Sequence, residues 1–152
     1  MKKMKNLFLI ITTLIILQSC GFKPIYSSQD LDINFINIEY EKNELNEKII
    51  KTLKEFSNQK SSKFYDVKLK TKKDKKILTK DSKGNPQSYE KKITLDLRIF
   101  DEKKNFIRTF TSKLNYKDKP NKFQLKQYEN EIQKQLLNDI IKDILIFLTE
   151  IE

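Results

Sequence analysis

The spacing of apolar residues changes along the chain, and this change restricts the fold more than any other feature of the sequence. Between Lys92 and Ile99, apolar and polar residues alternate strictly, which is the pattern of a β-strand with one buried and one wet face. From residue 122 to 152, apolar residues recur every three or four positions, as on one face of a long helix. That stripe consists of Leu125, Tyr128, Ile132, Leu136, Ile140, Ile144 and Leu148, and is broadened by Leu137, Ile141, Leu145 and Ile151.

Four other segments carry the same two patterns. Residues 33–40 and 106–116 are rich in β-branched and aromatic residues, and an alternating segment begins at Phe64, so we predict three further strands. A shorter helix is predicted over residues 44–57, because Asn43 can cap it and the acids of its first turn suit the positive end of the helix dipole. The apolar face of this helix consists of Leu45, Ile49, Ile50, Leu53 and Phe56.

The predicted elements follow one another in the order β-α-β-β-β-α. Turn-forming residues at 81–86 and a short polar stretch at 101–105 link the last three strands, which predicts an antiparallel meander. Two helices can cover one face of a four-stranded sheet, so we expect residues 33–152 to form an α+β domain, a two-layer sandwich. We expect the C-terminal helix to pack on the sheet, although its strongly apolar end also suits contact with a partner.

The first twenty residues differ in character from the rest of the chain. Three lysines, at positions 2, 3 and 5, precede an uncharged apolar run from Leu7 to Leu17. This run is shorter than the roughly 20 residues that a membrane-spanning helix needs. A basic start, a short apolar run and a small residue before a cleavage site are typical of a secretory signal peptide, which we place at residues 1–19. An uncleaved anchor or a buried helix is the alternative.

Cys20, the one cysteine of the chain, follows this segment. Leu17 at −3 and Ser19 at −1 resemble the lipobox of bacterial lipoproteins, whereas Gln18 departs from the usual small or aliphatic residue. We therefore expect Cys20 to carry acyl chains that hold the protein on a membrane through a tether of residues 20–32. A buried free thiol is the alternative. Gly21 replaces the aspartate that retains enteric lipoproteins at the inner membrane, so the outer membrane is expected.

Composition argues against an enzyme. The chain has no histidine and two glycines, which removes the usual acid–base residue, most zinc sites and a glycine-rich phosphate loop. One cysteine cannot form an internal disulfide. The acidic residues are scattered and no nucleophile motif is present, so we predict no catalytic residue, no metal site and no cofactor. An unmarked pair of carboxylates is the catalytic alternative.

The chain is basic, with 31 Lys or Arg residues, 21 Asp or Glu residues and a formal net charge of +10. Cleavage after residue 19 would remove three lysines and no acid. Eight lysines and two aspartates lie between Val67 and Lys83. Lys68, Lys70 and Lys72 would share one face of the second strand, and the others would gather at its hairpin end. The candidates for binding a phosphate-bearing, anionic lipid are Lys68, Lys70, Lys72, Lys73, Lys75 and Lys76.

The lysine-rich segment has two other interpretations. Lysines along a strand edge also discourage edge-to-edge aggregation of sheets, so a solvated edge is the structural alternative. A basic domain can bind nucleic acid, but an export signal would separate it from DNA and most RNA, and no nucleic-acid-binding module is recognisable. We therefore expect no nucleic-acid partner.

The run Cys20-Gly21-Phe22-Lys23-Pro24-Ile25-Tyr26 resembles the mature start of lipopolysaccharide-assembly lipoproteins of the LptE family. The alphaproteobacterial members begin C-G-F-[RK]-P-[LI]-Y. The predicted element order and the chain length are also similar to that family, so the resemblance extends over nearly the whole chain.

The resemblance implies an outer-membrane lipoprotein that is lipid-anchored and lies in the periplasm or inside the lumen of the LptD β-barrel. Members of the family plug that barrel, help it assemble, and assist the transport of lipopolysaccharide to the outer leaflet. They are also thought to bind lipopolysaccharide through basic residues. The alternative is a lipoprotein that binds another lipid or an envelope transporter and has no barrel partner.

Overall fold

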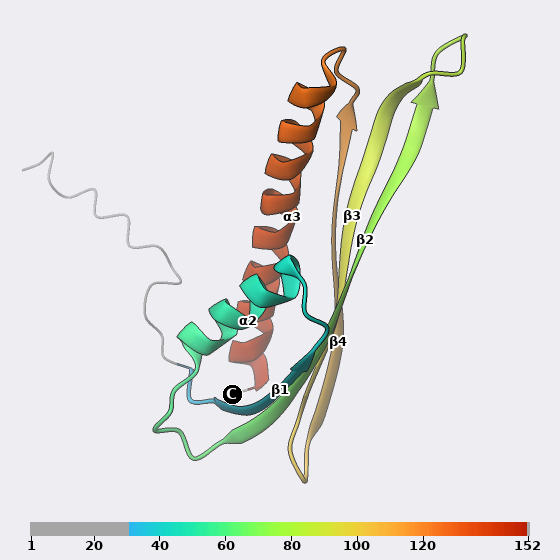
Figure 1. Ribbon diagram of the computed structural model, residues 1–152. Helices are drawn as coiled ribbons and strands as arrows, with labels where there is room; N and C mark the ends of the chain where they lie inside the picture. Colours follow the sequence, from blue (N-terminus) through green and yellow to red (C-terminus); the bar gives the residue numbers. More distant parts are fainter. Residues whose placement is uncertain (1–30, 152) are drawn as a thin grey trace, which may run out of the picture.

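The structure, a computed structural model, describes residues 31–151 (Figure 1). The expected signal peptide, Cys20 and most of the expected tether lie outside the described residues. The element order β-α-β-β-β-α is confirmed. The elements are β1 (Asn34–Tyr40), α2 (Glu44–Phe56), β2 (Phe64–Lys80), β3 (Pro86–Phe100), β4 (Asn105–Lys117) and α3 (Lys122–Ile151).

The four strands form one sheet in the order β1-β2-β3-β4. The last three are joined by short turns and pair antiparallel, so the predicted meander is confirmed. β1 pairs parallel with the start of β2, with Asn34 opposite Phe64 and Tyr40 opposite Leu69. Parallel neighbours need a crossover connection, and α2 supplies it.

Both helices cover the same face of the sheet, which confirms the two-layer arrangement (Figure 1). α2 lies over β1 and β2, and α3 lies over β3 and β4. Among the described residues, no helix is long and apolar enough to cross a membrane. The side chains that are almost fully buried between the two layers are Ile33, Leu45, Ile49, Leu53, Ile93, Leu95, Leu97, Ile99, Leu136, Ile140, Ile144 and Leu148.

The shorter helix begins where the sequence predicts. The Asn43 side-chain oxygen accepts hydrogen bonds from the backbone N–H groups of Leu45 (3.1 Å) and Asn46 (3.0 Å), which satisfies donors that the first turn leaves unpaired. The helix ends at Phe56, one residue earlier than predicted, and Ser57 forms its C-cap. The predicted apolar face is buried except for Phe56, which is half-buried, and Asn46 is buried beside it.

β2 and β3 are longer than their apolar patterns indicate. β2 continues through the lysine-rich segment to Lys80, because its backbone stays paired with β3 as far as Pro86. Beyond Leu69, however, β2 has no β1 beside it, and none of its later side chains is buried. The hairpin closes at Asp81–Asn85, where Gly84 adopts a φ of 84° that L side chains rarely adopt.

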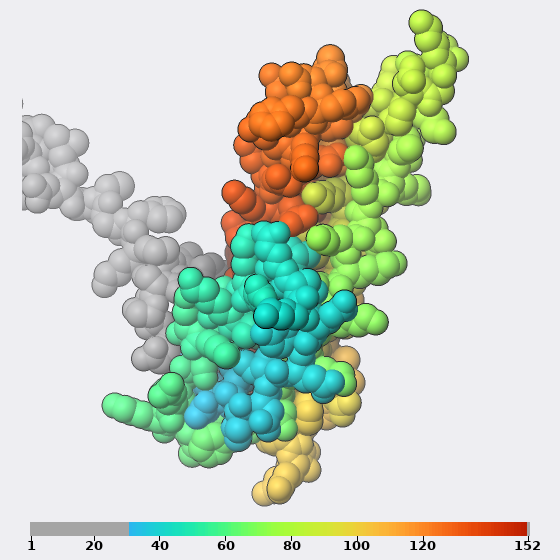
Figure 2. Space-filling view, in the orientation of Figure 1, coloured from blue at the N-terminus to red at the C-terminus, as the bar shows by residue number. Residues whose placement is uncertain are grey.

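The sheet therefore has two parts that differ in how they are covered. We call residues 74–92, the far half of the β2–β3 hairpin, the arm, and we call the rest of the sheet with α2 the base. In Figures 1 and 2 the tip of the arm diverges from the start of α3, whereas the base lies against both helices. Because the helices bury the base, charged side chains on the helix side of the sheet lie in and beside the arm.

Candidate functional site

The candidate lysines do not form one patch. Because side chains alternate along a strand, those on the parity of buried Tyr65, Val67 and Leu69 face the helices and the others face away. Lys68, Lys70, Lys72 and Lys76 lie on the outer face, and Lys73 and Lys75 lie on the helix side. Lys73, Lys75 and Lys76 also stand within the paired strand, so the expectation that they crowd the hairpin end is wrong for these three.

The outer-face lysines stand beside carboxylates. Lys68 forms an ion pair with Glu39 at 2.8 Å, and Lys72 forms one with Asp74 at 3.3 Å. In the strand register, Lys70 lies directly opposite Asp96, and Lys76 lies opposite Glu90. Directly opposed side chains of opposite charge attract one another across strands, so each of these four candidate lysines has a carboxylate beside it.

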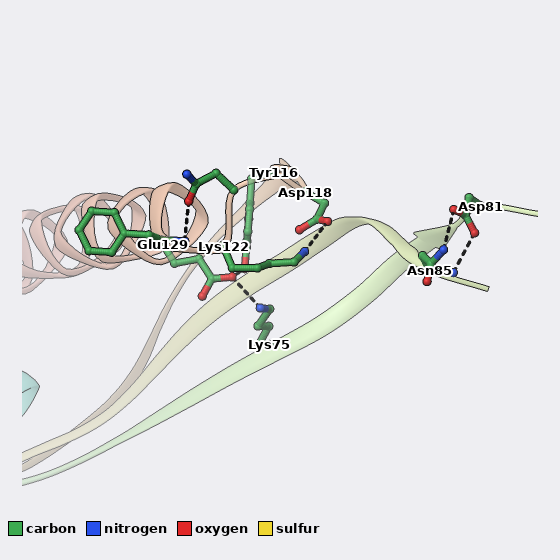
Figure 3. A network of polar contacts seen from close by, with 9 residues as sticks. Lys75, Asp81, Asn85, Tyr116, Asp118, Lys122 and Glu129 are labelled. Atoms are coloured by element: carbon green, nitrogen blue, oxygen red, sulfur yellow. Dashed lines mark hydrogen bonds and ion pairs between the residues drawn. The ribbon is translucent and has the colours of Figure 1, made fainter. Parts of the chain in front are cut away.

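On the helix side, Lys75 joins the arm to α3. Its Nζ donates to Glu129 Oε1 at 2.6 Å (Figure 3). The same Nζ lies 4.1 Å from the centroid of the Tyr89 ring. The Tyr116 hydroxyl donates to the same carboxylate oxygen at 2.7 Å, and Lys91 Nζ donates to the Glu129 backbone carbonyl at 2.9 Å. We call Lys75, Tyr89, Lys91, Tyr116 and Glu129 the Glu129 cluster.

Tyrosine rings form the apolar part of this cluster. Tyr89 and Tyr116 are 8% and 4% exposed, and their rings stack with centroids 5.4 Å apart. The rings of Tyr116 and of Tyr128, which lies on α3, meet edge to face with their centroids 6.0 Å apart. Lys119 Nζ lies 4.2 Å from the centroid of the Tyr128 ring. Aromatic faces attract cations, so rings and lysines support one another at the junction of arm and helix.

The pKa values in the cluster reflect burial and opposed charges. Burial raises the pKa of the Glu129 carboxyl, but the hydrogen bonds from Lys75 and Tyr116 and the charges of Lys75 and Lys91 outweigh it, so its pKa is lowered. Burial, followed by the hydrogen bond to Glu129, raises the pKa of Tyr116. Burial also lowers the pKa of Lys91, and the charges of Lys73 and Lys75 lower it further against the attraction of Glu129. Glu129 therefore remains ionised.

Cations exceed acids where β2, α3 and the start of α2 approach one another. The pKa of Glu44 is lowered mainly by a hydrogen bond from Lys48, and the charges of Lys73 and Lys134 lower it further. Lys73 and Lys134 are both exposed. Glu44 and Glu129 thus stand among five lysines, at positions 48, 73, 75, 91 and 134. This side of the sheet can attract an anion by charge, with lysines acting as mobile point charges.

Four residues of the cluster were not predicted as site residues: Tyr89, Lys91, Tyr116 and Glu129. Lys91 and Tyr89 share strand parity with Ile93, so extending the alternation of residues 92–99 toward the start of the strand would have placed them on the buried face. Tyr116 shares strand parity with buried Phe110, and the same reasoning would have placed it on that face. Glu129 lies 54 positions from Lys75, and nothing in the local pattern pairs them.

The described residues contain no group of three or more acidic, cysteine or histidine side chains that could hold a metal ion. Cys20 lies outside these residues, so its acylation stays a prediction. The chemistry that the described side chains offer is electrostatic and aromatic contact on the helix side of the sheet.

The fold is shared with solved bacterial lipoproteins. The rare lipoprotein B of Shewanella oneidensis superimposes with a TM-score of 0.56 at 14% identity, over 78% of this chain and 98% of that chain. A minor lipoprotein of Acinetobacter baumannii gives 0.55 at 15% identity, over 75% and 87%. A lipoprotein of Caulobacter crescentus gives 0.53 at 12% identity, over 78% and 88%. No family model and no curated protein matches the sequence. At these identities the likeness establishes that this chain has the fold of those three lipoproteins.

Proposed function

We propose that this protein is an outer-membrane lipoprotein of the LptE type, anchored through Cys20. In this proposal it plugs an LptD-type barrel, helps that barrel to assemble, and assists lipopolysaccharide transport without catalysis. The shared lipoprotein fold carries the proposal, because it covers the described chain independently of the short run from Cys20 to Tyr26. The two features come from separate parts of the sequence and favour the same class of protein.

We further propose that lipopolysaccharide is bound on the helix side of the sheet rather than on its outer face. The outer lysines already stand beside carboxylates, so an incoming phosphate would compete with them for each cation. On the helix side, Lys73 and Lys134 are exposed, and Lys91 is held beside other cations at a lowered pKa. An anionic lipid there would relieve repulsion among cations in place of disrupting an ion pair.

Purification from solubilised outer membranes tests the anchor and the barrel together. We expect the protein to co-purify with one large β-barrel in a one-to-one ratio. Cys20→Ala should abolish the uptake of labelled palmitate and leave the protein uncleaved or misplaced. Recovery without a barrel would favour the alternative of a lipoprotein with another lipid or transporter partner, and acyl labelling of the Cys20→Ala protein would refute the anchor.

Two charge-reversed variants test the lipid site with equal changes in net charge. Lys73→Glu with Lys134→Glu alters the helix side, and Lys70→Glu with Lys72→Glu alters the outer face. At low salt, the first pair should weaken lipopolysaccharide binding by roughly tenfold or more, and the second by much less. Arg at positions 73 and 134 should preserve binding, because a screened charge interaction does not require the geometry of lysine. Equal losses for both pairs would mean that binding follows net charge alone.

A further inference from the structure

A hollow of about 750 Å³ lies at the end of the base, remote from the Glu129 cluster. Apolar side chains from three strands line it, namely Ile36 of β1, Phe64 of β2 and Phe100 of β3. Phe64 and Phe100 alternate with buried Tyr65 and Ile99, so they lie on the face of the sheet that the helices do not cover.

The apolar side chains of this hollow are unusually exposed for their size. Ile36 is 60% exposed and Phe64 is 48% exposed, whereas their neighbours Phe35 and Tyr65 are 9% and 3% exposed. The pairing of β1 with β2 shifts by one residue between Phe35 and Ile38, and Ile36 lies within this irregularity. Clustered exposed apolar groups beside a hollow usually mark a surface that something covers.

The described chain begins close to this hollow. Asp32 forms an ion pair with Lys63 at 3.5 Å, and Lys63 is itself one of the residues that line the hollow. An extended chain spans about 3.4 Å per residue, so Tyr26 can lie up to about 17 Å from Leu31, and Phe22 up to about 31 Å. Residues 22–26 therefore have the reach to cover the hollow.

The chemistry of residues 22–26 complements that of the hollow. Phe22, Ile25 and Tyr26 offer apolar groups for its floor. Asp66, Asp101 and Glu102 line it together with three lysines, so its charge is mixed, and Lys23 can pair with one of the carboxylates. Backbone N–H groups of Lys103 and Lys104 donate to Asp101 and lower its pKa, which keeps that carboxyl ionised.

We propose that residues 22–26 of the same chain dock in this hollow, with their apolar side chains on its floor and Lys23 beside the carboxylates of Asp101 and Glu102. This docking does not depend on the barrel partner or on lipopolysaccharide binding. If Cys20 is acylated, as in the proposed function, docking sets the membrane anchor at the base end of the sheet and directs the arm away from it. The segment would then fix the orientation of the domain relative to the membrane as well as tether it.

Photo-crosslinking in the mature protein tests the docking directly. Benzoylphenylalanine in place of Phe100 should crosslink to residues 22–26, and the same group in place of exposed Leu78 on the distant arm should not. Changing Phe22, Ile25 and Tyr26 together to Ser should reduce the Phe100 crosslink by more than about tenfold, because the apolar contact is removed. Lys23→Glu should reduce it roughly two- to fivefold, and adding Glu102→Lys should restore it.

Mixing ¹⁴N- and ¹⁵N-labelled chains identifies the occupant. A crosslink confined to one isotope supports the proposal. A mixed-isotope crosslink would show a second copy, and a crosslink to detergent or lipid would show an amphiphile; either result overturns the proposal. An unchanged crosslink in the Ser variant would also overturn it. Continued acyl labelling of the Cys20→Ala protein, by contrast, would challenge the proposed function and leave the docking test intact.

Discussion

The base and the arm belong to the same sheet but are held by different forces. In the base, aliphatic side chains such as Leu53 and Leu97 are at most 1% exposed and pack between sheet and helices, against Ile140 and its neighbours on α3. The arm contacts α3 through polar and aromatic groups arranged around Glu129. Lys75 of the arm pairs with Glu129, and Tyr89 of the arm stacks on Tyr116 of β4, which also donates to Glu129. Beyond Ile77, the arm is a two-stranded hairpin with exposed side chains.

This difference shows how a small domain can combine stability with a charged binding face. Burial of aliphatic groups is non-directional and scales with area, so the base can be stable without any particular polar pair. The arm depends on specific partners and leaves lysines accessible. We therefore expect substitutions in the two regions to differ in size, in pH dependence and in how far their effects spread.

The largest effect is expected in the base. Leu53→Ala should lower the free energy of unfolding by about 2–5 kcal/mol, as for other buried leucines, because it leaves a cavity under α2. Lys51→Ala, at a side chain that is 79% exposed on the same helix, should change it by less than about 0.5 kcal/mol. Urea denaturation measures both. Similar losses at the two positions would mean that α2 does not pack through this face.

Glu129→Gln should weaken the junction of arm and α3 and lower the free energy of unfolding by about 1–3 kcal/mol, less than the loss at Leu53. The amide keeps the shape of the side chain and an oxygen that can accept from Tyr116, but it removes the charge that balances Lys75. Glu131→Gln, at an exposed position on the same helix, is the matched control and should be nearly neutral. Hydrogen exchange should rise in residues 74–92 more than in α2; a uniform rise would contradict the separation of base and arm.

The stability that Glu129 provides should depend on pH. Its pKa is lower in the folded protein than the value of about 4.3 expected for an unfolded chain. The carboxylate therefore contributes stability that is fully present above about pH 5 and is lost as the pH falls through the folded-state pKa. The difference between the parent and Glu129→Gln should be complete at pH 7 and should shrink as the pH falls below about 4. A difference that stays constant over this range would exclude the charge as its cause.

The smallest effect is expected at the tip of the arm. A Cβ at Gly84 would meet no atom within 4 Å, so Gly84→Ala is penalised only by the positive φ, at about 1 kcal/mol. Gly84→Asn should cost less, because asparagine tolerates this conformation better. We expect faster hydrogen exchange at residues 79–88 and almost no change in the urea midpoint. A large shift in that midpoint would show that the tip is coupled to the base.

The spacing of apolar residues and the helix cap predicted the element order, because both signals depend on residues close together in the sequence. Asn43 caps α2 through contacts two and three residues away, and the alternation from Ile93 to Ile99 reports a buried face directly. The far half of β2 escaped prediction because Lys72–Lys76 breaks the alternation. Its strand conformation comes from backbone pairing with β3, which no side-chain pattern records.

The sequence predicted that lysines of the second strand form the candidate site, but it did not predict how these lysines divide between the two faces of the sheet. The division of Lys70 from Lys73 follows from strand parity, which requires knowing that the strand continues through both residues. The role of Glu129 depends on where α3 crosses the arm, and this is set by packing of Leu136 and Ile140 farther along the helix. Long-range contacts of this kind are decided by the whole fold.

The parallel pairing of β1 with β2 also has a consequence for the order of folding. The meander β2-β3-β4 closes through turns of a few residues, whereas β1 meets β2 only across about 30 residues that include α2. Longer loops cost more closure entropy and non-local contacts form more slowly, so the first strand of the sequence should be the last to dock. Pulse-labelled hydrogen exchange during refolding should protect β3 before β1. Until β1 pairs with β2, the edge of β2 at residues 64–69 can pair with strands of other molecules. The partly folded chain should therefore aggregate through this edge rather than through the lysine-rich half of β2.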